Sequence, residues 1–270
     1  MSWRLILRQV PTLCLDMRAI VPSKFAGQGP SVVERLPVWQ GNQALALTEA
    51  FRIEHSDGPD DMLVIEGDCR RCDRMGWNMD GGLIEVHGPA GDHVGSGLRA
   101  GRIHVHGSAG RLAGCEMQGG LLEVDGDVGD FAGAPMPGSM EGMRGGILVV
   151  RGQAGARLGD RMRRGLVLVH GDAGDYAASR MVAGTIAVGG ALGSHAAWGM
   201  RRGSLVCRDT AINALATFVP TYHNVDVFWQ LLSRTLARHG GPFASLPGER
   251  VQRLSGDLAA GGQGELLLIQ

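Results

Sequence analysis

The chain has 270 residues, with 26 basic and 27 acidic side chains that leave a formal net charge of −1. This balance excludes a protein that binds nucleic acid or a membrane surface through bulk electrostatics. Forty-four glycines stand among plentiful aliphatic residues, so the composition also excludes a disordered chain.

The beginning of the chain and its cysteines indicate a compartment. Arg4 and Arg8 interrupt the first apolar stretch, which is therefore unlike a signal peptide. No apolar run approaches the roughly twenty residues that span a bilayer. The five cysteines are odd in number and scattered, unlike a disulfide framework. We predict a soluble cytoplasmic protein with no membrane partner.

Residues 1–60 precede the regular part of the sequence. Pro11, Pro22, Pro30 and Pro37 break this segment into short pieces, which are typical of strands or a short helix. The open end of a stacked β structure exposes strand edges and apolar core. We therefore predict that residues 1–60 form an N-terminal cap.

A repeat fills residues 61–208. Six units align, of which five are nineteen residues long and the third, residues 121–146, has twenty-six. An expanded earlier copy begins at Met62, and Ser204 begins an incomplete last one. Each unit opens with two aliphatic residues two positions apart, which indicates a short strand with one buried face. These pairs are Ile84 and Val86, Ile103 and Val105, Leu122 and Val124, Leu148 and Val150, Val167 and Val169, and Ile186 and Val188.

Glycines recur after each strand, as at Gly88 and Gly91 of the first unit, followed by a third small residue. Nineteen residues are too few for a strand, a helix and a return strand, which need about thirty. They fit one coil of a parallel β-helix, in which equivalent positions stack. We predict an all-β fold: a right-handed parallel β-helix of about seven coils. Its glycines are then corner residues rather than phosphate-binding loops.

The third position of each strand points outward and changes character along the chain. It is polar in the first three units, as at Glu85, and apolar in the last three. Together with two first-position residues, the apolar side chains form a strip consisting of Ile147, Val149, Leu166, Leu168 and Ala187. Such a strip is covered either by the chain's own C-terminal helix or by another protein, and both alternatives stay open. If a partner covers it, Leu168→Glu should leave the coil folded and weaken assembly.

Residues 209–270 leave the repeat register and form the third region. Asn224 is a possible N-cap, and Gly240 with Gly241 and Pro242 is a helix stop, so we expect a helix of about fifteen residues between them. Its apolar stripe, which should pack on the coils, consists of Val225, Phe228, Leu232 and Leu236. The chain ends in a strand-like run, residues 266–269, that needs a pairing partner.

Three histidines are candidate metal ligands. His104 and His106 stand two residues apart on one strand, and His87 lies one coil away. This spacing can bind zinc when a neighbour supplies a third ligand. The alternative is a solvated polar ladder beside Glu123 and Asp125, which we favour because no acidic or cysteine partner spans the repeats to complete a site. We predict no metal, no cofactor and no catalytic residue in this chain.

Cys69, Cys72 and three aspartates have a simple structural interpretation. Cys69 and Cys72 form a CxxC motif without a second pair, which is weak evidence for redox or metal chemistry. Asp130, Asp160 and Asp175 stand near coil corners, where side chains usually bond turns.

Arginines recur at one position of the repeat. Arg163 with Arg164, and Arg201 with Arg202, occupy this position, and Arg144 stands near it. They form either a basic ridge for a polyanionic ligand or a partner's acids, or a solvated face, which is the interpretation we favour.

The repeat resembles a known family. Coils of the form GxxGxxxG with Met three residues before the closing glycine resemble the terminal repeat domain of the glutamate synthase large subunit. More closely, they resemble the C subunit of formylmethanofuran dehydrogenase. Residues 32–54, the FVPTY stretch at 218–222 and the tail 256–270 are similar to the ends of that family, so the resemblance covers nearly the whole chain.

This resemblance implies a scaffold subunit whose partner subunits hold the metal ligands, the hydrolase centre and the transferase site. One such complex moves a formyl group from tetrahydromethanopterin to a furan carrier (methanofuran or methylofuran) and hydrolyses it to formate. The other is the tungsten or molybdenum formylmethanofuran dehydrogenase. We favour the bacterial formyltransferase/hydrolase complex because the chain is rich in Arg and Ala and Lys24 is its only lysine.

Two further interpretations stay open. One is a stand-alone metal-dependent enzyme on a β-helix, like the carbonic-anhydrase-like hexapeptide proteins, although their coils of about eighteen residues do not match this pattern. The other is a coupler between amidotransferase sites, as in glutamate synthase, which would work with glutamine-hydrolysing and flavin domains.

Overall fold

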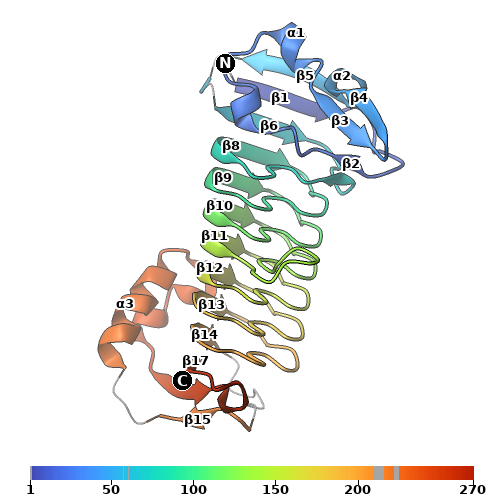
Figure 1. Ribbon diagram of the computed structural model, residues 1–270. Coiled ribbons are helices and arrows are strands. Elements are labelled where there is room, and N and C mark those ends of the chain that lie inside the picture. Colours follow the sequence, from blue (N-terminus) through green and yellow to red (C-terminus); the bar gives the residue numbers. More distant parts are fainter. Residues whose placement is uncertain (1, 57, 60, 209–215, 222–224) are drawn as a thin grey trace.

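The computed structural model describes residues 2–56, 58–59, 61–208, 216–221 and 225–270 (Figure 1). Strands dominate these residues, and one long sheet of thirteen strands, most of them parallel, runs through the molecule. The prediction of a mostly β chain is thereby confirmed. Within the described ranges, no helix has both the length and the apolar character that crossing a membrane requires.

Eight strands in the middle of this sheet are parallel neighbours, in chain order. They are β6 (Met62–Glu66), β8 (Asp80–His87), β9 (Ala100–Val105), β10 (Gln118–Val124), β11 (Arg144–Val150), β12 (Arg164–Val169), β13 (Thr185–Val188) and β14 (Ser204–Cys207). The strands pair so that equivalent repeat positions are neighbours, with Ile84 beside Ile103 and Ile103 beside Leu122. The aliphatic pairs of all six units are fully buried, as their alternation predicts.

A second row of contacts joins the repeats away from this sheet. Single parallel bridges connect Cys69 to Ala90, and then successively Ala109, Val128, Ala154, Ala173 and Leu192. The large apolar residue near the end of each unit, Leu98 in the first and Met in the others, is fully buried. Successive repeats therefore stack through both a strand and a loop, with the loops on one side of the strands in Figure 1.

The recurring small residues serve two purposes. The third in each unit adopts a left-handed backbone, with φ of 62° at Gly159 and 59° at Ala178, where alanine takes its place. The second passes close to the preceding repeat, because a Cβ on Gly174 would stand 2.8 Å from the backbone nitrogen of Ala156. The interpretation of the glycines as corner residues is confirmed at these positions.

Aspartates at the corners tie neighbouring repeats together. Asp130 Oδ1 accepts a hydrogen bond from the backbone N–H of Ala156 at 2.8 Å, and Asp175 Oδ1 accepts one from Ser194 at 2.8 Å. The prediction that these side chains bond turns is confirmed for both. Asp160 differs: it is buried, accepts a hydrogen bond from Ser179 Oγ at 2.8 Å and forms an ion pair with the next repeat.

The N-terminal residues extend the long sheet and add a smaller one. β1 (Ser2–Leu7) pairs in parallel with β6 and antiparallel with β5 (Phe51–Ser56), which is the edge strand. The second sheet contains β2 (Leu15–Asp16), β3 (Pro37–Gln40), β4 (Gln43–Ala46) and β7 (Cys72–Asp73). Three short helical segments lie between these strands: η1 (Pro22–Lys24), α1 (Pro30–Val33) and α2 (Leu47–Ala50). Trp3, Phe25 and Phe51 are buried in the same core as the repeats.

The C-terminal residues return to the last repeat. β17 (Gly264–Ile269) pairs in parallel with β14 and antiparallel with β16 (Val251–Gly256), which pairs with β15 (Val219–Pro220). The strand-like run at the C-terminus therefore has the partner that it needs. Three short 3-10 turns lie in this region: η2 (Gly241–Phe243), η3 (Leu246–Gly248) and η4 (Leu258–Ala260).

The helix of this region, α3, spans Asp226–Ala237 and is shorter than the fifteen residues expected. Asn224, the expected N-cap, lies outside the described residues. The expected stripe is also partly wrong, because Phe228 is 43% exposed while Trp229 is buried. The helix turns Trp229 inward, where the indole Nε1 donates a hydrogen bond to the carbonyl oxygen of Glu249 at 2.8 Å.

Candidate functional site

A polar cluster lies on the outer face of the long sheet, where the histidine candidates stand. The pairing of β8 with β9 places Glu85 beside His104, and His106 follows on the same face. Glu85 Oε2 is 2.8 Å from His106 Nε2 and 3.4 Å from His104 Nδ1. Asp125 Oδ2 is 3.1 Å from His104 Nε2 and 3.2 Å from His106 Nδ1. Each carboxylate therefore contacts both imidazole rings.

His87, the third candidate, takes part by stacking. Its ring lies parallel to that of His106, with the centroids 4.6 Å apart and the planes at 5°. Among the described residues, the group able to surround one metal ion is Glu85, His104 and His106, whose ligand atoms lie within 4.8 Å of one another. Sequence reasoning missed Glu85, although it occupies the same repeat position as His104, one unit earlier.

Arginines hold the carboxylates of the cluster. Arg151 Nε donates to Asp125 Oδ1 at 2.9 Å, and Glu123 forms ion pairs with both Arg102 and Arg151. Burial acts to raise the pKa of Asp125, but hydrogen bonds from His104 and Arg151 outweigh it and lower that pKa. Asp125 is therefore held as a carboxylate that accepts hydrogen bonds.

The apolar strip on the second half of the same face is covered by the chain itself. Val149, Leu168 and Ala187 are buried in a cluster with residues of α3, η2, η3 and β17. Ile147 and Leu166 are partly buried against the same cluster. In Figure 1, α3 lies beside β12, β13 and β14, where this cover forms.

In the structure, the chain's own C-terminal segment therefore covers the apolar strip. The buried side chains offer no surface to a partner, so a partner contact in this region would use the outside of α3 instead. The expectation that Leu168→Glu leaves the coil folded is corrected, because Leu168 is 0% exposed and a charge there would be buried.

Two histidines mark the boundary between the polar cluster and the covered strip. The ring of His170 meets that of Phe243 edge-on at 5.4 Å, and its Nε2 is buried without a hydrogen-bond partner among the described residues. Burial lowers the pKa of His170, and Arg151 and His239 lower it further. Burial also lowers the pKa of His239, opposed by Glu123. Both rings favour their neutral forms.

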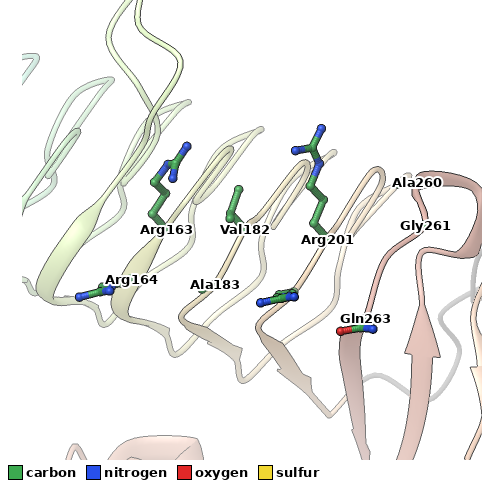
Figure 2. A pocket seen from close by; sticks show the side chains of 9 residues that line it. Arg163, Arg164, Val182, Ala183, Arg201, Ala260, Gly261 and Gln263 are labelled. Atoms are coloured by element: carbon green, nitrogen blue, oxygen red, sulfur yellow. The ribbon is translucent and has the colours of Figure 1, made fainter.

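The recurring arginines line a groove at another side of the stacked repeats (Figure 2). It has a volume of about 560 Å³ and is lined by Arg163, Arg164, Val182, Ala183, Arg201, Arg202, Ala260, Gly261 and Gln263. Arg163 and Arg201 project to the same side with the shorter Val182 between them, because the three residues occupy the same position of three successive repeats. Val182 and Ala183 therefore form the floor of the groove, and one pair of arginines lies on each side of them.

An adjoining hollow of about 460 Å³ shares Arg163, Val182, Arg201 and Ala260 and adds Arg161, Arg180, Met140, Trp198 and Gly199. Acidic groups neutralise some of these arginines: Arg163 pairs with Glu141 at 3.0 Å, and Arg180 pairs with Asp160. Within the described part of the chain, Arg164, Arg201 and Arg202 form no ion pair and are exposed. This surface is therefore positively charged.

The cysteines form no disulfide among the described residues. Cys69 and Cys72 are buried next to each other, and their contact, together with burial, raises the pKa of Cys72. A thiol held protonated inside the core is a poor nucleophile and a poor metal ligand.

Fold and site together define a class of protein: a glycine-rich repeat protein with stacked units, one long parallel sheet and a basic groove. A search of protein-family models gave no match to this chain. The C subunit of the molybdenum-containing formylmethanofuran dehydrogenase 1 of Methanosarcina barkeri is 36% identical over 93 residues, 33% of this chain and 31% of the relative. The C subunit of the tungsten-containing formylmethanofuran dehydrogenase 2 of Methanothermobacter wolfeii is 32% identical over 84 residues, 30% of this chain and 31% of the relative. The aligned part of this chain thus spans about a third of these curated relatives.

A solved structure matches over almost the full length. It is a chain in the crystal structure of the formyltransferase/hydrolase complex (FhcABCD) from Methylorubrum extorquens in complex with methylofuran. That chain is 41% identical, with a TM-score of 0.90 and coverage of 98% of both chains. The chain belongs to the family of formylmethanofuran dehydrogenase C subunits.

Proposed function

We propose that this chain is the structural subunit of a formyltransferase/hydrolase complex and that its repeats form a right-handed parallel β-helix. The complex would transfer a formyl group from tetrahydromethanopterin to a furan carrier and hydrolyse it to formate. The full-length match to a chain of the FhcABCD complex carries this proposal.

The use of the polar groups supports a structural rather than a catalytic role. Corner aspartates such as Asp130 and Asp175 are engaged with the backbone of the following repeat. Asp160 is engaged with Ser179 and Arg180 of the next repeat. These groups hold repeats together, and a carboxylate committed to such bonds is not available as a general base. We propose that the catalytic metal and the carrier are bound by partner subunits.

The arginine groove is the surface that we assign to contact with the rest of the complex. Arg201 and Arg202 are exposed without an acidic partner in the described ranges, and Gln263 extends the polar lining. Exposed guanidinium groups bind carboxylates through paired hydrogen bonds. Acidic side chains of a neighbouring subunit fit this groove.

Isolation of the native assembly through a tag on this chain tests the proposal, with mass spectrometry to identify the co-eluting proteins. Transferase and hydrolase subunits should elute with the chain in a fixed ratio, and the chain alone should release no formate from formylated carrier. Elution of the chain by itself, or turnover by the chain alone, would overturn the proposal.

A charge-reversed variant examines the groove. Arg201→Glu with Arg202→Glu should weaken assembly at least about tenfold, since close charge pairs at interfaces couple by more than about 1.4 kcal/mol. Arg35→Glu, at an exposed position near the N-terminus, is the matched control and should assemble normally. Normal assembly of the double variant would remove the groove from the contact surface.

The second candidate is the C subunit of a tungsten or molybdenum formylmethanofuran dehydrogenase, favoured by the curated relatives. The same isolation separates the two, because a co-eluting subunit with bound tungsten or molybdenum would support the second candidate. Cysteines that form no disulfide in the described part of the chain agree with a reducing compartment, and we propose the cytoplasm.

A further inference from the structure

The cluster of Glu85, His104 and His106 has a geometry that a solvated polar ladder does not require. Its three side chains come from neighbouring strands of one rigid sheet, so the backbone fixes their spacing. His104 turns Nδ1 toward Glu85 Oε2, and His106 turns Nε2 toward the same oxygen. The two rings thus direct one nitrogen each to a single point.

The opposite nitrogens have a partner of their own. His104 Nε2 and His106 Nδ1 both face Asp125 Oδ2, at 3.1 and 3.2 Å. A neutral imidazole carries its proton on one nitrogen and a lone pair on the other. When Asp125 accepts one N–H from each ring, the lone pairs of both rings point toward Glu85.

Two lone pairs and a carboxylate oxygen that face one another repel electrostatically, and a cation between them relieves this repulsion. Arg151 and Arg102 lie close by, but they are engaged with Asp125 and Glu123. Glu85 has no arginine or lysine ion pair among the described residues. The point on which the two nitrogens and the Glu85 oxygen converge is therefore left for a cation.

We propose that Glu85, His104 and His106 bind a divalent transition-metal ion, with zinc as the expected occupant. Two histidines and one carboxylate are an established ligand set for zinc and for ferrous iron. Asp125 is a positioning residue that fixes both ring tautomers, as outer carboxylates do around metal-bound histidines. The inference goes beyond the structural role proposed above and does not depend on it.

The dimensions of the cluster suit such an ion. Zinc–nitrogen distances of about 2.0–2.1 Å in a tetrahedron put neighbouring ligand atoms about 3.3 Å apart. The Glu85 oxygen already stands 2.8 and 3.4 Å from the two nitrogens, and all three ligand atoms lie within 4.8 Å. Small side-chain rotations complete the geometry. His106 is 33% exposed, so the ion can enter and its remaining position is open to water.

Metal binding by the full chain tests the proposal. The protein is stripped with a chelator, titrated with Zn²⁺ against a competing chromophoric chelator and then measured by elemental analysis. One equivalent per chain should bind, and His104→Ala with His106→Ala should lower the affinity at least about 100-fold. His55→Ala, at an exposed position on the edge strand β5, is the matched control and should keep the site.

Two further measurements separate ligands from structural neighbours. Asp125→Asn should lower the affinity by about 10–100-fold while one equivalent still binds, since it only positions the rings. X-ray absorption of the zinc-loaded wild-type chain should show scattering from two imidazole rings. Absence of binding to the wild-type chain, unchanged affinity in the double variant or a spectrum with oxygen ligands alone would each overturn the proposal.

Discussion

The outer face of the long sheet has two halves that share the same strand arrangement and differ in whether the C-terminal segment covers them. Over β8, β9 and β10 the third strand position is polar, and this half stays partly open: Glu85 contacts His104, while Glu123 forms ion pairs with arginines. Over β11, β12 and β13 the same position is Val149, Leu168 and Ala187, which the C-terminal segment covers. The residue at this repeat position is therefore polar where the outer face stays partly open and apolar where the C-terminal segment covers it.

The largest expected effect comes from placing a charge under the cover. Leu168→Glu should lower the free energy of unfolding by about 3–5 kcal/mol, because an unpaired carboxylate replaces a fully buried side chain. Val227→Glu on the outside of α3, at a residue 74% exposed, is the control and should change stability by less than about 0.5 kcal/mol. Urea unfolding measures both. Equal midpoints for wild type and Leu168→Glu would mean that the cover is not formed.

Substitutions of the inward-facing aliphatic residues should lower the free energy of unfolding by similar amounts in the two halves. Leu122 lies under the polar half and Leu148 under the covered half, and both are fully buried. Truncation of either to alanine should cost about 3 kcal/mol, because each leaves a similar cavity between stacked repeats. Unfolding in urea should give values within about 1 kcal/mol of each other. A much smaller cost for one of them would show that the stack is not continuous.

The hydrogen bond that orients α3 should make a smaller contribution. Trp229→Phe removes the donor to the carbonyl of Glu249, which then loses its partner, and should cost about 1 kcal/mol. The midpoint of thermal unfolding reports this change, and Trp198→Phe, at a half-exposed tryptophan outside the cluster that α3 covers, is the control. A larger loss for Trp198→Phe would place the main docking contacts elsewhere.

The smallest effect is on pH dependence at the boundary of the two halves. The pKa values of His170 and His239 are lowered, mainly by burial, from the ordinary 6.5. The unfolded chain therefore binds protons first as the pH falls, so this stability is complete above about pH 6.5 and decreases as the pH falls through the folded values. Thermal midpoints between about pH 7.5 and 5 should fall, and His170→Gln should reduce the slope. A midpoint that rises on acidification would contradict the burial of these rings.

The sequence alone predicted much of the difference between the polar and the apolar half of the outer face. The nineteen-residue period placed the inward pairs such as Ile103 and Val105, and the outward change from Glu123 to Val149, because strand alternation is local. The sequence did not show whether the C-terminal helix or a partner covers the apolar strip. The cover depends on which distant segment returns to the sheet. It also depends on which face of α3 points inward, and the hydrogen bond from Trp229 to the carbonyl of Glu249 sets that face.

The candidate site was predicted in part. His104 and His106 were identified by spacing, but Glu85, which lies beside His104, was missed as their partner. Strand alternation predicts the face on which a residue lies, but it does not predict the direction that its side chain takes on that face. The arginines of the groove were visible as a recurring position, yet the groove needs Gln263 and Ala260 of the returning tail to close it.

Hydrogen exchange of α3 in the isolated chain, followed by mass spectrometry, tests most directly the claim that the molecule covers its own apolar strip. The amides of Asp226–Ala237 should be protected before any partner is added, and protection there should change little on assembly. Exchange at the rate of an unstructured peptide until a partner is present would contradict the account, since the strip would then be a partner surface.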